Sequence, residues 1–188
     1  TNKDSITLNK LLDGTTLTVN STLNATGVVV NAAAGATNSF SLTLGGDVTV
    51  PVYQETNNEF TAVTITSNGA KKNVVSQVTS NATADSTFTV KGATALDLTV
   101  GNAASLIKTI NGTDATGALT IDASASATSA VGVVLEIKGG SANDKLTGDS
   151  NTKSKLYGNV GNDTLIGGSG DDTLEGGVGN DSLTGGTG

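Results

Sequence analysis

The sequence predicts an all-β protein, a parallel β-solenoid (β-helix) that continues into a tighter parallel β-roll of repeated turns. Three observations lead to this fold class. Residues 139–188 repeat a glycine-rich nonapeptide, and a fixed period indicates stacked units. Residues 60–138 consist of short alternating strands that each end in Gly, Asn or Asp. The chain has 3 Phe, 2 Tyr and no Trp, Cys, Met or His, which argues against a compact core of large aromatic side chains.

Residues 1–59 form the first predicted segment, which is rich in β-structure. The candidate strands are short, contain mainly Thr, Val and Leu, and are separated by turns of Gly, Asn and Asp; they cover residues 5–8, 16–20, 27–31, 39–44 and 47–52. Pro51 indicates an edge position or a strand end, because proline cannot donate a ladder hydrogen bond. This segment is compatible with a small sandwich and equally with the first rungs of a solenoid.

Residues 60–138 form the second predicted segment, a solenoid whose strands alternate apolar and polar residues. Alternation places one apolar set on the inner face: Val63, Ile65, Phe88, Val90, Leu96, Leu98, Val100, Leu119, Ile121, Val133, Leu135 and Ile137. The low-complexity stretch 123–130 is predicted to be a surface loop. An antiparallel sandwich with the same strand chemistry is the alternative, because periodicity alone does not exclude it.

Residues 139–188 form the third predicted segment, in which full blocks begin at Gly139, Gly158, Gly167 and Gly176. Each block opens with glycine, continues with an Asn-Asp or Asp-Asp pair, and has one leucine two residues later. These leucines are Leu146, Leu165, Leu174 and Leu183. Each block is therefore a tight acidic turn followed by a very short strand, which buries a face only by stacking on its neighbours.

Stacking two blocks per coil brings like charges together. Asp144, Asp163 and Asp181 would line one edge, and Asp172 the other. Carboxylates in register repel unless a cation lies between them, and Ca²⁺ accepts carboxylate and carbonyl oxygens in flexible geometry. We therefore expect several Ca²⁺ ions, with these four aspartates as side-chain ligands. Asp171 is a further candidate in the variable slot that elsewhere holds Asn, and carbonyls or turn geometry would come from Gly140, Gly168, Gly170, Gly177 and Gly179.

The blocks GNVGNDTLI, GGSGDDTLE and GGVGNDSLT resemble the nonapeptide GGxGxDxUx of RTX (repeats-in-toxin) proteins. The resemblance implies a parallel β-roll with calcium between successive coils, type I secretion and folding outside the cell. Ala142 and Asn159 replace turn glycines. In the degenerate block from Gly148, Ser154 stands where Asp belongs, between Lys153 and Lys155. We expect no complete calcium site in that block, with a lysine partly replacing the ion.

A second resemblance concerns LTVGNAASLIKTINGTDATGALTIDAS, which runs into the RTX blocks. It is similar to the carboxy-terminal part of RTX-type bacterial surface-layer (S-layer) proteins. The resemblance implies a calcium-dependent structural module at the bacterial cell surface, within a fragment of a larger secreted protein. Its partners would be further copies of itself, and cell-surface lipopolysaccharide through parts of the parent outside this sequence. The alternatives are an RTX adhesin segment, acting as a spacer or ligand-binding module, and a carbohydrate-active β-helix.

Composition argues against several other functions. The net charge of −7 disfavours nucleic-acid binding, and no apolar run reaches transmembrane length. Without His, Cys or Arg, the chain has no Ser-His-Asp triad, zinc helix or arginine clamp. Asp97, Asp122 and Glu136 could formally act as paired carboxylates, but Asp97 and Asp122 are predicted to face solvent or cap turns. The sequence therefore predicts that the protein is not an enzyme.

Overall fold

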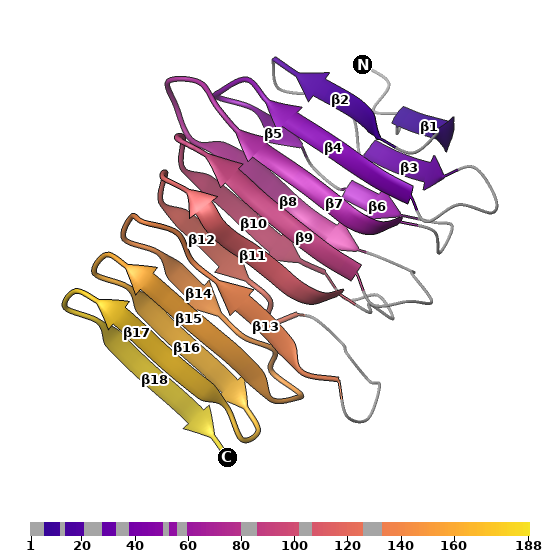
Figure 1. Cartoon of the computed structure of the whole chain (residues 1–188). Coiled ribbons are helices and arrows are strands. Elements are labelled where there is room, and N and C mark those ends of the chain that lie inside the picture. Colours follow the sequence, from indigo (N-terminus) through magenta and orange to yellow (C-terminus); the bar gives the residue numbers. More distant parts are fainter. Residues whose placement is uncertain are drawn as a thin grey trace.

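The computed structural model describes residues 6–11, 14–20, 28–32, 38–50, 53–55, 60–79, 86–101, 107–125 and 133–188. Every regular element in these ranges is a β-strand, and the strands follow one another along a single stack from the N-terminal to the C-terminal end (Figure 1). In the described part of the chain, no helix has the length and apolar character needed to cross a membrane.

The strands divide into two sheets. The first is a 10-stranded sheet of β1 (Ile6–Leu11), β3 (Val28–Ala32), β5 (Thr49–Val50), β6 (Tyr53–Glu55), β8 (Asn73–Thr79), β10 (Leu96–Val100), β12 (Leu119–Asp122), β14 (Lys145–Thr147), β16 (Thr164–Ser169) and β18 (Ser182–Thr187). The second is an 8-stranded sheet of β2 (Thr15–Val19), β4 (Asn38–Leu44), β7 (Phe60–Ser67), β9 (Ser86–Gly92), β11 (Ile107–Ala115), β13 (Leu135–Lys138), β15 (Ser154–Val160) and β17 (Thr173–Val178).

All pairings between the described strands are parallel, and from β7 onward the chain alternates strictly between the two sheets. Each coil therefore contributes one strand to each sheet, which is the geometry of a two-sided parallel solenoid. The predicted fold class is confirmed, and the antiparallel sandwich is excluded for the described strands. Both sheets continue across the segment boundaries predicted after residues 59 and 138. The division into three segments therefore describes differences in sequence pattern and stays a prediction.

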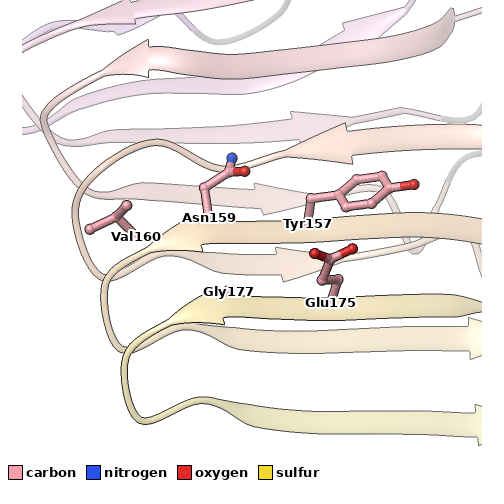
Figure 2. Close-up of a pocket in the computed structure, with 5 residues that line it drawn as sticks. All are labelled: Tyr157, Asn159, Val160, Glu175 and Gly177. Carbon is pink, nitrogen blue, oxygen red and sulfur yellow. The ribbon is translucent and has the colours of Figure 1, made fainter.

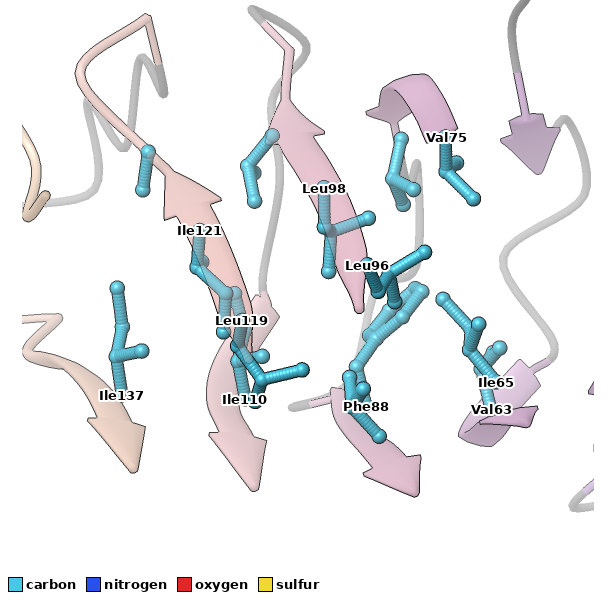
Figure 3. Packing of buried hydrophobic residues seen from close by; sticks show 14 of the residues in the cluster. Val63, Ile65, Val75, Phe88, Leu96, Leu98, Ile110, Leu119, Ile121 and Ile137 are labelled. Atoms are coloured by element: carbon cyan, nitrogen blue, oxygen red, sulfur yellow. The ribbon is translucent and has the colours of Figure 1, made fainter. Parts of the chain in front are cut away.

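Two facing columns of side chains fill the space between the sheets (Figure 3). Register in the second sheet aligns Phe40, Val63, Phe88, Ile110, Ile137, Leu156 and Leu174. Register in the first sheet aligns Val75, Leu98, Ile121, Leu146, Leu165 and Leu183. Because parallel strands in register repeat the same face at every coil, one apolar residue per strand is enough to continue each column.

The core narrows toward the C-terminal end. Among the described residues, the two fully buried aromatic side chains, Phe40 and Phe88, both lie in the first half of the chain, and most buried aliphatic side chains precede the repeats. In the repeats only leucines remain: Leu146, Leu156 and Leu165 are fully buried, and Leu174 is partly buried. Leu183, which is aligned with the buried Leu165, is 46% exposed because β18 is the outermost strand of its sheet. The repeats thus have much less apolar burial per coil than the preceding segment.

Two further predictions need correction. Val133 is only partly buried and lies before β13, whereas the other predicted inward residues of residues 60–138 are buried. Ala123, predicted to lie in a surface loop, is fully buried because the inward alternation of β12 extends one position beyond the strand. Its N–H donates to the Thr147 carbonyl at 3.0 Å. Pro51 and residues 126–130 lie outside the described residues.

Removing a large buried side chain from the core should lower the stability of the protein. We expect Phe88→Ala to lower the free energy of unfolding by about 3–5 kcal/mol, because it leaves a cavity at a side chain that is 1% exposed. Thr87→Ala, at the neighbouring exposed position of the same strand, is the matched control and should have little effect. Denaturant unfolding in calcium measures both variants. Equal effects of the two variants would contradict the packing described here.

Candidate metal centre

Asp144, Asp163 and Asp181 stack along one edge of the solenoid, as the repeat spacing predicted. The Asp144 N–H donates to Asp163 Oδ1 at 2.7 Å, and the Asp163 N–H donates to Asp181 Oδ1 at 2.9 Å. At the head of this column, the Leu119 N–H donates to Asp144 Oδ1 at 2.7 Å. Each carboxylate therefore uses its first oxygen to bind the backbone of the preceding coil.

The second oxygens of these carboxylates have different environments. Asp144 Oδ2 accepts the Gly140 N–H at 2.6 Å. Asp163 Oδ2 and Asp172 Oδ2 are buried and have no hydrogen-bond partner. Asp163 is only 1% exposed, so its free oxygen is also removed from water. Leaving a buried acceptor of a charged group unsatisfied is costly, and a cation is the partner that such an oxygen lacks.

The opposite edge carries Asp172, as predicted. Its Oδ1 accepts the Ser154 N–H at 2.6 Å, which repeats the inter-coil bond of the first edge. Asp171 is exposed and, with Asp172, lines a pocket of about 340 Å³ that is otherwise formed by Gly170, Gly185, Gly186 and Gly188. Asp171 thus shares this pocket with Asp172.

The glycine that opens each block faces the second oxygen of its own aspartate. A Cβ added at Gly158 would overlap both Asp163 Oδ2 and the Gly176 carbonyl oxygen. The same pair of oxygens, from the block's own Asp and from the next opening glycine on that edge, surrounds Gly139 and Gly167. Sequence reasoning did not assign these opening glycines to the site. The signal was present, because glycine occupies the first position of every block.

The glycines that were assigned to the site mainly shape the turns. Gly168, Gly170, Gly177 and Gly179 adopt φ of 115°, 102°, 101° and 146°, which L side chains rarely adopt. Gly140 contributes instead through its N–H bond to Asp144. Asn159, which replaces a turn glycine, has φ of 73°, and its Nδ2 donates to the Gly139 carbonyl at 2.8 Å. Asn is among the few non-glycine residues that tolerate this region.

The degenerate block places a hydroxyl where the other blocks place a carboxylate. Ser154 Oγ accepts the Asp149 N–H at 3.0 Å and lies where a Cβ on Gly148 would reach. A neutral hydroxyl with a partner does not require a cation, in agreement with the expectation of an incomplete site. Lys153 and Lys155 are both exposed, so the replacement of the ion by a lysine stays a prediction.

Burial and mutual repulsion disfavour the charged form of the stacked aspartates, so a nearby positive charge would stabilise them. Burial raises the pKa of Asp144, Asp163 and Asp172, because removal from water disfavours the charged form. Backbone N–H donors lower each pKa in part, whereas neighbouring carboxylates raise it further: Asp163 acts on Asp144, and Asp181 acts on Asp163. Asp171 and Asp149 act in the same way on Asp172. A divalent cation would relieve both the burial and the repulsion.

The available donors suit calcium. No group of three or more His, Cys, Asp and Glu side chains gathers within the described ranges, so a site formed only by carboxylates is not what the turns offer there. They offer one or two carboxylates per turn together with carbonyl oxygens of glycines, such as that of Gly176 beside Asp163 Oδ2. Calcium accepts this mixture of carboxylate and carbonyl oxygens. The residues present therefore fit the ion that the sequence predicted.

Comparison with known families supports the same ion. Residues 157–188 match the family model of the RTX calcium-binding nonapeptide repeat (4 copies). Such repeats bind calcium, several ions per array. The match begins after Asp144, yet Asp144 continues the column of Asp163 with the same inter-coil bond. The acidic edge therefore extends at least one coil beyond the matched residues. No curated protein and no solved structure matches the chain.

Protonation of the buried aspartates should partly stabilise the repeats when calcium is absent. The folded-state pKa values of Asp144, Asp163 and Asp172 are raised above the unfolded value of about 3.9. In calcium-free solution the resulting penalty is complete above the raised values and disappears as the pH falls through them to the unfolded value. We expect the repeats in EGTA to gain stability as the pH falls from neutral toward about 4. Thermal unfolding followed by circular dichroism measures this.

The control for this titration is the same series in calcium, where protonation competes with the ion and the gain should shrink or reverse. A stability in EGTA that falls steadily from neutral pH to mildly acidic pH would contradict the assigned burial of these carboxylates.

A methyl group at an opening glycine should block the space between the aspartate Oδ2 and the glycine carbonyl oxygen, where we place the ion. We expect Gly158→Ala to weaken the stabilisation by calcium and to cost about 1–3 kcal/mol, because its Cβ would overlap Asp163 Oδ2 and the Gly176 carbonyl. Gly185→Ala is the matched control: it keeps the backbone carbonyl of residue 185 beside Asp172, its Cβ would have no heavy atom within 4 Å, and neither glycine has positive φ. Calcium titration of the melting temperature compares them. Identical responses of the two variants would exclude calcium binding between Asp163 Oδ2 and the Gly176 carbonyl oxygen.

Proposed function

We propose that this chain is a calcium-dependent structural module of a secreted bacterial S-layer protein, in which calcium drives folding outside the cell and self-assembly into a lattice. The observation that supports the calcium step is the unsatisfied Oδ2 of Asp163, inside a turn where the residue is 1% exposed. The S-layer assignment is supported by the resemblance of the preceding Thr- and Ala-rich strands to that class.

The proposed ligands follow from the stacked turns. On the first edge, Asp144, Asp163 and Asp181 would contribute side-chain oxygens, joined by carbonyls of opening glycines such as Gly176. On the second edge, Asp172 would bind with the Gly185 carbonyl, and Asp171 would add charge at the pocket that both aspartates line. Bound calcium would supply the positive charge that these oxygens lack.

The residues of the chain then explain a folding switch. Where calcium is scarce, the repeats have buried carboxylates without partners and few apolar side chains, so the unfolded chain is favoured. Where calcium is abundant, each site that binds only the folded form adds about 2.7 kcal/mol at a hundredfold excess over its dissociation constant. Secretion before folding would follow from this difference between cytosol and exterior.

Surfaces for contact with further copies lie on the outer face of the second sheet. Tyr157 and Glu175 stand beside each other on β15 and β17 and line a shallow pocket with Asn159, Val160 and Gly177 (Figure 2). Val160 is 49% exposed and pairs in register with Val178, which is 70% exposed, so the two valines form a small exposed apolar patch. We propose a second copy as the occupant. Attachment to lipopolysaccharide would fall to parts of the parent outside this sequence.

Calcium-dependent assembly tests this function. We expect wild-type protein to form sheets or large oligomers in calcium, seen by electron microscopy and light scattering, and to release them in EGTA. Asp163→Asn should need a higher calcium concentration, because the amide keeps the Oδ1 bond to the Asp144 N–H but replaces the free oxygen with a donor. Asp114→Asn, which removes the same charge at an exposed position, is the matched control.

The other outcomes separate the alternatives. A protein that folds with calcium but stays monomeric at high concentration would overturn lattice assembly and favour an RTX adhesin spacer. Turnover of a polysaccharide would favour the carbohydrate-active β-helix. An unchanged circular dichroism spectrum and melting temperature on adding calcium would reject the calcium step itself.

A further inference from the structure

Asn73 occupies the same register column as the calcium-edge aspartates, in a coil outside the repeats. Asn73 pairs with Leu96 across the first sheet, and Leu96 pairs with Leu119. Leu119 is the residue whose N–H donates to Asp144 Oδ1. Asn73 is fully buried, which is rare for an amide side chain unless its polar atoms are satisfied.

Asn73 makes the inter-coil bond that the aspartates make. Its Oδ1 accepts the Val48 N–H at 3.1 Å, from a residue 25 positions earlier. Asp144 Oδ1 accepts the Leu119 N–H at 2.7 Å, also over 25 positions. The turn of residues 68–73 is as long as the acidic turns of residues 158–163 and 176–181, and its second residue, Gly69, has positive φ, as Asn159 and Gly177 have in those turns. The turn of residues 68–73 therefore resembles these acidic turns in length and in backbone conformation at its second residue.

They differ at the second atom of the side chain. Asn73 Nδ2 donates to Ser67 Oγ at 2.8 Å and to the Asn68 carbonyl at 3.1 Å. Ser67 Oγ in turn donates to the Ala95 carbonyl at 3.3 Å. The amide nitrogen thus binds oxygens of its own turn directly, whereas Asp163 Oδ2 in its turn has no partner. The NH₂ group of Asn73 therefore satisfies oxygens of its turn by hydrogen bonding, as a bound cation would do by coordination.

Charge in this turn is balanced by lysines. Lys71 Nζ lies 2.8 Å from Asp47 Oδ2, and Lys72 Nζ lies 2.5 Å from Asp97 Oδ2. Both lysines belong to the turn, and both carboxylates belong to neighbouring strands or turns along the stack. These exposed pairs contribute little stability individually, but they leave the edge without the excess of negative charge that marks the acidic turns.

We infer that the turn of residues 68–73 is a calcium-independent counterpart of the acidic turns, and that Asn73 is the residue that makes it so. The coils around it then form a folded platform without calcium, on which the calcium-dependent repeats stack. The core supports this division, because the buried Phe40 and Phe88 and most buried aliphatic side chains of the described residues precede the repeats, whereas Leu146, Leu156 and Leu165 are the buried apolar side chains within them. The contrast with the repeats rests on the proposed calcium function, but the role of Asn73 does not.

Hydrogen exchange followed by mass spectrometry on the whole chain, in calcium and in EGTA, tests the inference. In the wild type, peptides covering residues 60–79 should stay protected in both solutions, and peptides covering residues 145–187 should lose protection in EGTA. Asn73→Asp should lose protection of residues 60–79 in EGTA, because a carboxylate oxygen would then face the Asn68 carbonyl in a fully buried position. Asn68→Asp makes the same chemical change in the same turn at an exposed side chain and should behave as wild type.

Two results would overturn the inference. The first is a loss of protection of residues 60–79 in EGTA in the wild type, which needs no variant to fold. The second is equal protection of Asn73→Asp and Asn68→Asp in EGTA. If residues 145–187 ignore calcium while Asn73→Asp still loses protection in EGTA, the proposed calcium function fails and the role of Asn73 stands. The two failures are thereby distinguished.

Discussion

The structure of the C-terminal coils depends on one interaction, the hydrogen bond from a backbone N–H to the Oδ1 of the aspartate one coil later. This bond fixes the register between coils, as in the pair formed by the Asp144 N–H and Asp163. It also holds a charged side chain inside the turn, where water does not reach the second oxygen of Asp163. The same contact that orders the stack therefore creates its need for a cation.

The coils of the solenoid are linked and stabilised in two different ways along the chain. In the earlier coils, inter-coil bonds span 25 residues, as between Val48 and Asn73, and large apolar side chains fill the interior. In the repeats the same bonds span 19 and then 18 residues, and single leucines fill the interior. Shorter coils order fewer residues but bury less apolar surface, so their stability must come from elsewhere. This difference is the physical basis of the proposed coupling between calcium binding and folding of the repeats.

The sequence predicted the periodic features correctly because they are local. Alternation identified Val63, Phe88 and Leu98 as inward residues, and the repeat spacing placed Asp163 and Asp172 on opposite edges. It missed the part played by opening glycines such as Gly158, since their closeness to Asp163 Oδ2 depends on the path of the turn. It also placed Ala123 on the surface, because composition suggested a loop where burial continues past β12.

By itself, then, the sequence determined that the chain coils, where its inner face lies, and which acidic residues recur at each turn, because these follow from period and alternation along one strand. Only the tertiary structure decided which oxygens are satisfied. Asp144 Oδ2 meets a backbone N–H, Asp163 Oδ2 meets none, and Asn73 fills the equivalent position with a donor. These outcomes depend on atoms brought together by the fold of each turn and by the register between coils, which no local pattern specifies.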